Sequence, residues 1–214
     1  ASTTGLQTSD LEPPDRDVDP RPPALSTYEA MYFIVGTREN TTAKMQLSFQ
    51  YRPFDEEIFG TGIFAPLSKL HFGYTQTSLW DIGQESAPFR DTSYRPSIFY
   101  FDPDFWRSAD GGRRFSFAAG LEHESNGRDG ESSRSINIAY LRTRWRTDFG
   151  PDYYWVLWPK FVKYLEKSDN TDIPDYRGYV DLNVRVGRYD GFEVSGVFRK
   201  GNRSAGSMQL DLTY

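Results

Sequence analysis

The feature that most constrains this chain is an alternation of apolar and polar residues that begins near residue 28 and continues to residue 214. The run Lys44–Tyr51 is a clear example, because every second residue in it is apolar. Comparable runs cover 70–75, 114–121, 180–186 and 208–214. A period of two is typical of a β-strand with one apolar face, so an all-β fold is expected.

About ten strands are expected, and most are as long as the roughly 9–11 residues that a tilted strand needs to cross a bilayer. One of them carries Arg142, Arg144 and Arg146 on its polar face, which suits a polar barrel interior better than the surface of a sandwich. A transmembrane antiparallel β-barrel is therefore favoured over a soluble β-domain. The expected strands are 28–37, 43–53, 67–80, 91–102, 113–125, 134–147, 152–164, 178–188, 191–199 and 207–214.

The composition agrees with a barrel and excludes several other classes. Aromatic residues make up 16% of the 214 residues, and transmembrane barrels gather such residues at the two membrane interfaces. The chain has no cysteine, which excludes a disulfide scaffold and a cysteine-ligated metal site. A net charge of −5 gives no basic surface for nucleic acid, so no nucleic-acid partner is expected.

Two parts of the chain are expected. Residues 1–27 are rich in proline and polar residues, which predicts an extended N-terminal arm outside the main fold. Residues 28–214 would form the barrel. The chain starts with Ala1-Ser2-Thr3 and lacks the charged and apolar regions of an export signal, so either no such signal exists or this is the mature form.

One stretch carries residues suited to chemistry. His123 and Ser125 are two positions apart, so in a strand they share a face. The alternation puts them on the apolar face with Phe117 and Leu121. Polar side chains on a face directed at lipid are costly unless they have partners, which makes this pair a candidate site.

The following hairpin supplies a partner. If its loop is centred on Gly130, each residue pairs with the one equally far on the other side, so His123 opposes Asn137 and Ser125 opposes Ser135. Opposed side chains lie about 4.5–5.5 Å apart at Cβ. A serine–histidine–asparagine line results, in which the histidine accepts the serine proton and the amide orients the imidazole. The alternative is that His-x-Ser is purely structural, as is expected of His71 on the polar face.

These residues resemble the active-site signature of the outer membrane phospholipase A family, lipid hydrolases of the Gram-negative outer membrane. The pattern H-x-S-N-G-R stands here as His123–Arg128, and S-R-S-x-N as Ser133–Asn137. The resemblance continues in Tyr74–Trp80 and Pro88–Pro96, and covers most of residues 28–214.

The resemblance implies a twelve-stranded outer-membrane barrel with its active site on the lipid-facing wall. By match, Ser125 is the nucleophile, His123 the general base and Asn137 the group that orients His123. The implied activity is phospholipase A1/A2-type ester hydrolysis, in which a serine hydrolase cleaves acyl esters of phospholipids and lysophospholipids.

The resemblance also implies that the enzyme depends on Ca²⁺ and is activated as a homodimer. Ser133 and the backbone carbonyl of Arg128 match ligands from one subunit, and Ser86 matches a ligand from the other. Gln76 matches a polar residue buried in the dimer contact. A metal site without a matched carboxylate is expected to bind Ca²⁺ weakly.

Two alternatives remain open, and the strand count differs from that of the family. One alternative is a catalytically silent pore or structural barrel, which predicts ion conductance without ester turnover. The other is a soluble β-barrel that binds lipid or sugar inside. Ten expected strands against twelve suggest that the final hairpin is missing from this chain, because a membrane does not tolerate unpaired strand edges.

Overall fold

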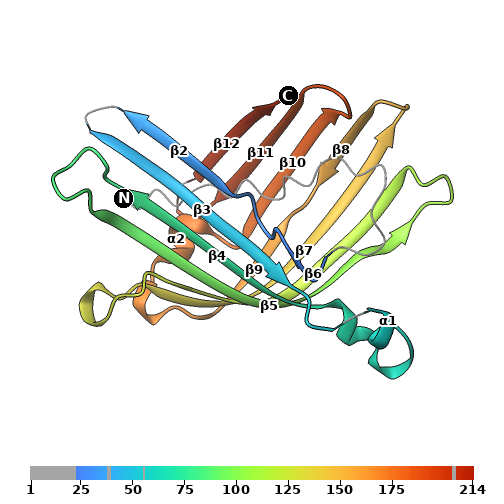
Figure 1. Cartoon of the computed structure of the whole chain (residues 1–214), viewed down its shortest axis with the longest axis horizontal. Helices are drawn as coiled ribbons and strands as arrows, with labels where there is room; N and C mark the ends of the chain where they lie inside the picture. The colour runs from blue at the N-terminus through green and yellow to red at the C-terminus, as the bar shows by residue number, and fades with distance from the viewer. Residues whose placement is uncertain (1–22, 38–39, 55, 204–205) are drawn as a thin grey trace. The chain divides into compact units, whose positions relative to one another are not determined.

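The computed structural model describes residues 23–37, 40–54, 56–203 and 206–214 (Figure 1). They form a single antiparallel sheet of twelve strands with a few short helices. No helix in these described ranges is both long and apolar enough to cross a membrane. The strands are β1 Leu25–Ser26, β2 Tyr32–Thr37, β3 Thr41–Tyr51, β4 Leu70–Trp80, β5 Phe89–Arg107, β6 Arg113–Ser125, β7 Ser135–Phe149, β8 Tyr153–Leu157, β9 Lys160–Glu166, β10 Val180–Arg188, β11 Glu193–Lys200 and β12 Gly206–Thr213.

The α-helices are α1 Glu56–Phe59 and α2 Ile173–Arg177, and the 3₁₀ helices are η1 Gly62–Lys69, η2 Gly130–Ser132 and η3 Ser168–Asn170. The strands follow the order β1-β3-β4-β5-β6-β7-β8-β10-β11-β12, with β2 also beside β3 and β9 beside β10 and β7. The sheet therefore has ten strand positions. β1 and β2 share one position beside β3, and β8 and β9 share one position beside β10. The prediction of about ten strands is therefore confirmed.

Two predicted strands are interrupted, for different reasons. The strand expected at 152–164 is split into β8 and β9 around Pro159, which has no N–H to donate to a neighbouring strand. The strand expected at 28–37 starts only at Tyr32, because Tyr28–Ala30 are buried instead of continuing an exposed strand. The predicted arm 1–27 lies mostly outside the described residues, and its part Leu25–Ser26 forms β1.

The chain forms two compact units, which are described separately. Among the described residues, unit 1 comprises those within 23–98, 122–137 and 166–170, and unit 2 the remainder. In unit 1, the alternation along β3 leaves Leu47 and Phe49 exposed, whereas Gln46 and Ser48 are buried. The polar side chains thus occupy the protected face, and the apolar ones the open face.

Unit 2 repeats this inversion with charged residues. Along β10, Leu182 and Val186 are exposed, whereas Asp181 and Arg185 are buried. The Arg199 guanidinium forms two hydrogen bonds with the Asp181 carboxylate, at 2.5 and 2.6 Å. An exposed apolar face requires an apolar solvent, and strands with apolar residues outside and polar residues inside are typical of transmembrane barrels. The predicted fold class is therefore confirmed.

The connection that contains α2 packs tightly against the β11–β12 connection in unit 2. The backbone N–H of Asn202 donates to the Pro174 carbonyl at 3.0 Å, and Arg203 forms an ion pair with Asp175 at 2.8 Å. Gly178 ends α2 with a φ of 65°, and a Cβ on it would lie 2.0 Å from the carbonyl oxygen of Lys200. Only glycine fits this position.

We expect Gly178→Ala to lower the midpoint of heat unfolding more than Gly111→Ala. Both glycines have positive φ, so each substitution brings backbone strain of about 1–3 kcal/mol. A Cβ at Gly111 meets no atom within 4 Å, whereas one at Gly178 overlaps the Lys200 carbonyl. Heat-dependent gel migration of the refolded variants measures the difference, and equal midpoints would contradict the packing described here.

Candidate active site

The end of β6 presents its alternate side chains to opposite faces. Leu121 and His123 are exposed, and Glu122 between them is buried. His123 therefore lies on the apolar outer face, as the sequence pattern predicts. Ser125, the last residue of β6, is half-buried at the start of the loop to β7.

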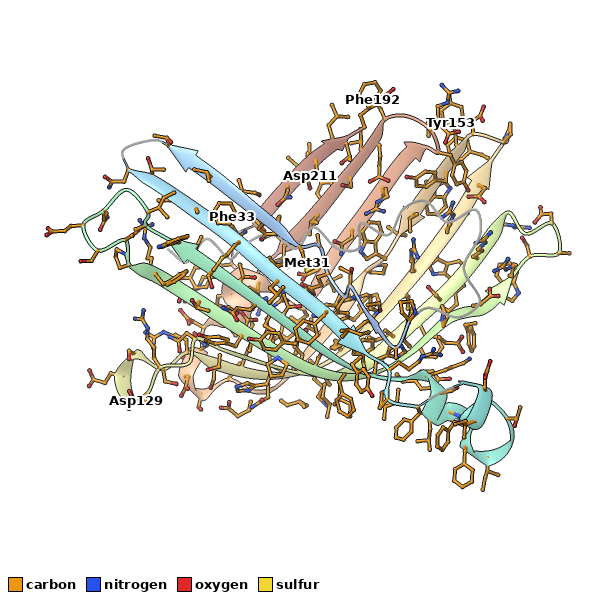
Figure 2. The ribbon with its side chains drawn as sticks, in the orientation of Figure 1. Met31, Phe33, Asp129, Tyr153, Phe192 and Asp211 are labelled. Carbon is orange, nitrogen blue, oxygen red and sulfur yellow. The ribbon has the colours of Figure 1, made fainter. Side chains whose placement is uncertain are left out.

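The loop between β6 and β7 has the symmetry that the sequence predicts. Gly130 has a φ of 56°, and Asp129 beside it marks this loop in Figure 2. The N–H of Asn126 donates to the carbonyl of Arg134 at 3.0 Å, and these two residues are equally far from Gly130. The same register brings His123 and Asn137 together, with 2.8 Å between His123 Nδ1 and Asn137 Oδ1.

This contact determines the protonation pattern of the imidazole. The amide oxygen of Asn137 can only accept a hydrogen bond, so His123 Nδ1 carries the proton in this contact. In a neutral imidazole, Nε2 then keeps its lone pair and can accept a proton. The contact thus fixes the orientation of the ring and leaves Nε2 as an acceptor.

The Ser125 hydroxyl is held by the backbone of the loop. Its Oγ accepts a hydrogen bond from the N–H of Gly127 at 3.0 Å, and within the described residues it forms none with His123. Hydrogen bonds between catalytic groups are often long without substrate. Gly127 has a φ of 68°, and a Cβ on it would lie 2.9 Å from the Tyr94 ring, so the position requires glycine.

Asn126 organises the rest of this loop. Its Nδ2 donates to the Ser132 carbonyl at 2.8 Å, and its Oδ1 accepts from the N–H groups of Arg134 and Arg128 at 3.0 and 3.3 Å. One side chain thereby links both arms of the loop that follows Ser125. Sequence reasoning did not single out Asn126 or the Gly127 N–H, although both lie inside the H-x-S-N-G-R pattern.

Two of the expected metal ligands lie in this loop, next to a carboxylate that sequence reasoning missed. Ser133 Oγ donates to Asp169 Oδ2 at 2.6 Å, and Ser135 Oγ donates to the same atom at 2.9 Å. These hydrogen bonds hold the pKa of the Asp169 carboxyl below its usual value. Asp169 therefore remains ionised until the pH falls through that lowered pKa, below the ordinary range for aspartate.

The third expected ligand lies in the connection between β4 and β5. Ser86 there has a φ of 63°, an uncommon conformation for a residue with a side chain. Arg128 Nη2 donates to the Arg90 carbonyl at 3.3 Å, which links the β6–β7 loop to the start of β5. Within the described part of the chain, no hydrogen bond joins Ser86 to Ser133 or Arg128, and no group of three or more His, Asp or Glu residues could hold a metal ion.

Gln76 and His71 lie on opposite faces of β4. Gln76 opposes the exposed Leu47 of β3, and its Oε1 accepts a hydrogen bond from the Tyr74 hydroxyl at 2.9 Å. A polar amide therefore lies within the apolar outer face. His71 is buried, and its Nδ1 lies 3.0 Å from the Lys69 carbonyl, in agreement with the interior position that the alternation predicts.

The same residues are covered by a family model. The model described as phospholipase A1 matches residues 20–214. A putative phospholipase A1 of Neisseria meningitidis is 36% identical over 169 residues, which cover 77% of this chain and 42% of the relative. Phospholipase A1 of Escherichia coli K12 is 32% identical over 160 residues, covering 72% of this chain and 52% of the relative. The chain thus spans about half the length of these curated relatives.

Solved structures show the same likeness. Outer membrane phospholipase A from Escherichia coli has a TM-score of 0.66 and 29% identity, over 81% of this chain and 64% of that one. The Salmonella typhi outer membrane phospholipase, solved as a dimer with bound calcium, has a TM-score of 0.65 and 30% identity, over 81% of this chain and 65% of that one. This chain belongs to the phospholipase A1 family.

Proposed function

We propose that this chain carries the active site of a calcium-dependent phospholipase of the Gram-negative outer membrane, which hydrolyses acyl esters of phospholipids and lysophospholipids. The contact of 2.8 Å between His123 and Asn137 on the outer apolar face carries this proposal. A polar pair directed toward lipid is costly, so its presence there points to a role in a reaction at that face. Ser125, two residues further along the same strand, is the nearby nucleophile.

In the first half of the reaction, Ser125 Oγ attacks the carbonyl carbon of an acyl ester. His123 Nε2 accepts the hydroxyl proton, while Asn137 holds the ring through Nδ1. His123 then gives this proton to the departing alkoxide, which leaves as a lysophospholipid or as a glycerophosphoester. The acyl chain remains on Ser125 and stays in contact with the apolar face.

In the second half, water replaces the alcohol. His123 accepts a proton from the water as its oxygen attacks the acyl carbon, and returns it to Ser125 Oγ as the fatty acid leaves. The N–H of Gly127, which donates to Ser125 Oγ in the resting site, is the backbone donor available to the negative oxygen of both tetrahedral intermediates. A neutral triad gains from such a donor because Asn137 supplies no charge.

The oxygen atoms of this loop fit a bound Ca²⁺. The proton of the Ser133 hydroxyl is engaged by Asp169, so the lone pairs of Ser133 Oγ stay available to a cation. The Arg128 carbonyl accepts no hydrogen bond from any residue the structure describes. Ca²⁺ prefers hydroxyl and carbonyl oxygens of this kind. When bound, the ion supplies positive charge beside the scissile ester.

Ser86 would complete this site from a second subunit, and Gln76 would lie in the contact between the two subunits. Ser86 lies in the β4–β5 connection, whereas Ser133 and Arg128 lie in the β6–β7 loop, so the two parts of the site can come from different subunits. A monomer would then hold the Ser125–His123–Asn137 triad but an incomplete Ca²⁺ site. Dimerisation would switch the enzyme on.

Ser125→Ala is expected to abolish ester release from phospholipid in mixed micelles, because it removes the nucleophile. Chelation of Ca²⁺ is expected to abolish turnover by the parent protein. Ser195→Ala, a substitution in β11 outside the site, is the control that should retain turnover. Turnover that survives Ser125→Ala would contradict the site, whereas ion conductance without turnover in the parent would favour the silent barrel.

Asn137→Ala is expected to lower kcat by roughly tenfold or more, because the imidazole loses the acceptor that fixes its tautomer. Asn137→Asp keeps an acceptor oxygen at the same position and should restore much of the loss. Steady-state kinetics of both variants in the same micelles test this role. Equal losses in the two variants would contradict it.

Specific activity should fall when the protein is diluted into mixed micelles of constant concentration, because dilution separates the subunits. Chemical crosslinking should preserve the activity of the diluted sample. A specific activity that is independent of concentration, at protein levels where crosslinking detects only monomer, would contradict activation by dimerisation.

A further inference from the structure

The inner face of β6 carries two carboxylates that alternate with the proposed catalytic residues. Glu122 is 4% exposed, and Glu124 is half-buried. His123 and Ser125 occupy the positions between and after them, on the opposite face. A strand cannot turn one face without turning the other, so whatever holds Glu122 and Glu124 also sets the direction of His123 and Ser125.

A buried arginine of the neighbouring strand attracts both carboxylates. Arg95 of β5 is 5% exposed, and its Nη2 lies 2.6 Å from Glu29 Oε2. The negative charges that stabilise its guanidinium are those of Glu29, Glu122 and Glu124. From the same strand, Ser93 Oγ donates to Glu124 Oε1 at 3.1 Å. The Arg95 charge therefore acts on three carboxylates, and it is in direct contact with that of Glu29.

Glu29 is itself held in place. Its N–H donates to Ser48 Oγ at 2.9 Å, and the Ser48 and Thr75 hydroxyls are hydrogen-bonded at 2.7 Å. Gln46 Nε2 donates to the Ala30 carbonyl at 2.8 Å. The inward turn of Tyr28–Ala30 between β1 and β2 is thus fixed to the polar faces of β3 and β4.

We propose that Arg95, held by Glu29, is a positioning residue for the reaction: it fixes the carboxylates behind β6 and thereby keeps His123 and Ser125 aligned with Asn137. This inference rests on the proposed function. Loss of the Arg95 charge removes a favourable attraction from all three carboxylates in a region where water is scarce. Besides taking up protons, the carboxylates can respond by shifting the end of β6, and we expect that shift to change the direction of the outward residues.

The alternative is that the ion pair only stabilises the fold, and unit 2 offers a matched control. Arg199 and Asp181 form a buried pair of the same kind on the inner face of β10 and β11. No proposed catalytic residue lies on these two strands. A purely structural role predicts the same behaviour when either arginine is replaced.

The experiment uses the full chain, refolded in mixed micelles with Ca²⁺, and the variants Arg95→Met, Arg95→Lys and Arg199→Met. Arg95→Met should lower kcat roughly 10- to 100-fold, as small misplacements of catalytic groups do. Its KM should stay within about twofold, because the substrate surface is unchanged. Arg95→Lys should recover much of kcat, and Arg199→Met should lower the heat midpoint while keeping kcat per folded molecule.

A parent-like kcat in Arg95→Met, or an equal loss of kcat in Arg199→Met, would overturn the proposal. If Arg95→Met does not fold, Glu29→Gln tests the proposal instead, because this substitution removes one charge and keeps the shape of the side chain. A reduced kcat of Glu29→Gln supports the proposal, and a parental kcat overturns it. Labelling of Ser125 by a sulfonyl fluoride adds a readout without substrate. A parent that neither turns over ester nor is labelled contradicts the proposed function itself.

Discussion

The strands expose an apolar face and bury a polar one, and the rest of the structure depends on this constraint. Because the apolar side chains are directed outward, the charged ones must be buried. A buried charge is tolerated only with a partner of opposite sign. Arg95 with Glu29 in unit 1 and Arg199 with Asp181 in unit 2 satisfy this requirement separately. The polar pair His123 and Asn137 departs from this pattern, since it lies on the apolar face and its two members hydrogen-bond each other, as Gln76 does with Tyr74.

What could be predicted from the sequence is local in character. The face of each strand follows from a period of two, and the contact of His123 with Asn137 follows from the symmetry of a loop around Gly130. Both need only neighbouring residues and geometry. Pro159 could have been recognised as the break between β8 and β9 by the same kind of reasoning, because its missing N–H is a local property.

What could not be predicted depends on residues that are far apart in the chain. Asp169 meets Ser133 and Ser135 across more than thirty positions, and Glu29 meets Arg95 across 66. No periodicity relates such residues, since their contact depends on which loops and strands the sheet brings together. Tyr28–Ala30 resemble the start of a strand in the sequence, but the need to neutralise Arg95 explains why they turn inward.

The charges behind the site also protect its register. If β6 slipped by one residue against β7, every side chain would change face, and His123 would point inward while Glu122 and Glu124 pointed toward lipid. An ionised carboxylate on the outside of a barrel is costly, although less so than the roughly 2–4 kcal/mol that a basic residue costs at the middle of the bilayer. Two carboxylates oppose the slip together, and the loss of their attraction to Arg95 adds to the cost. These two acidic residues therefore favour the strand register in which His123 and Ser125 lie on the outer face.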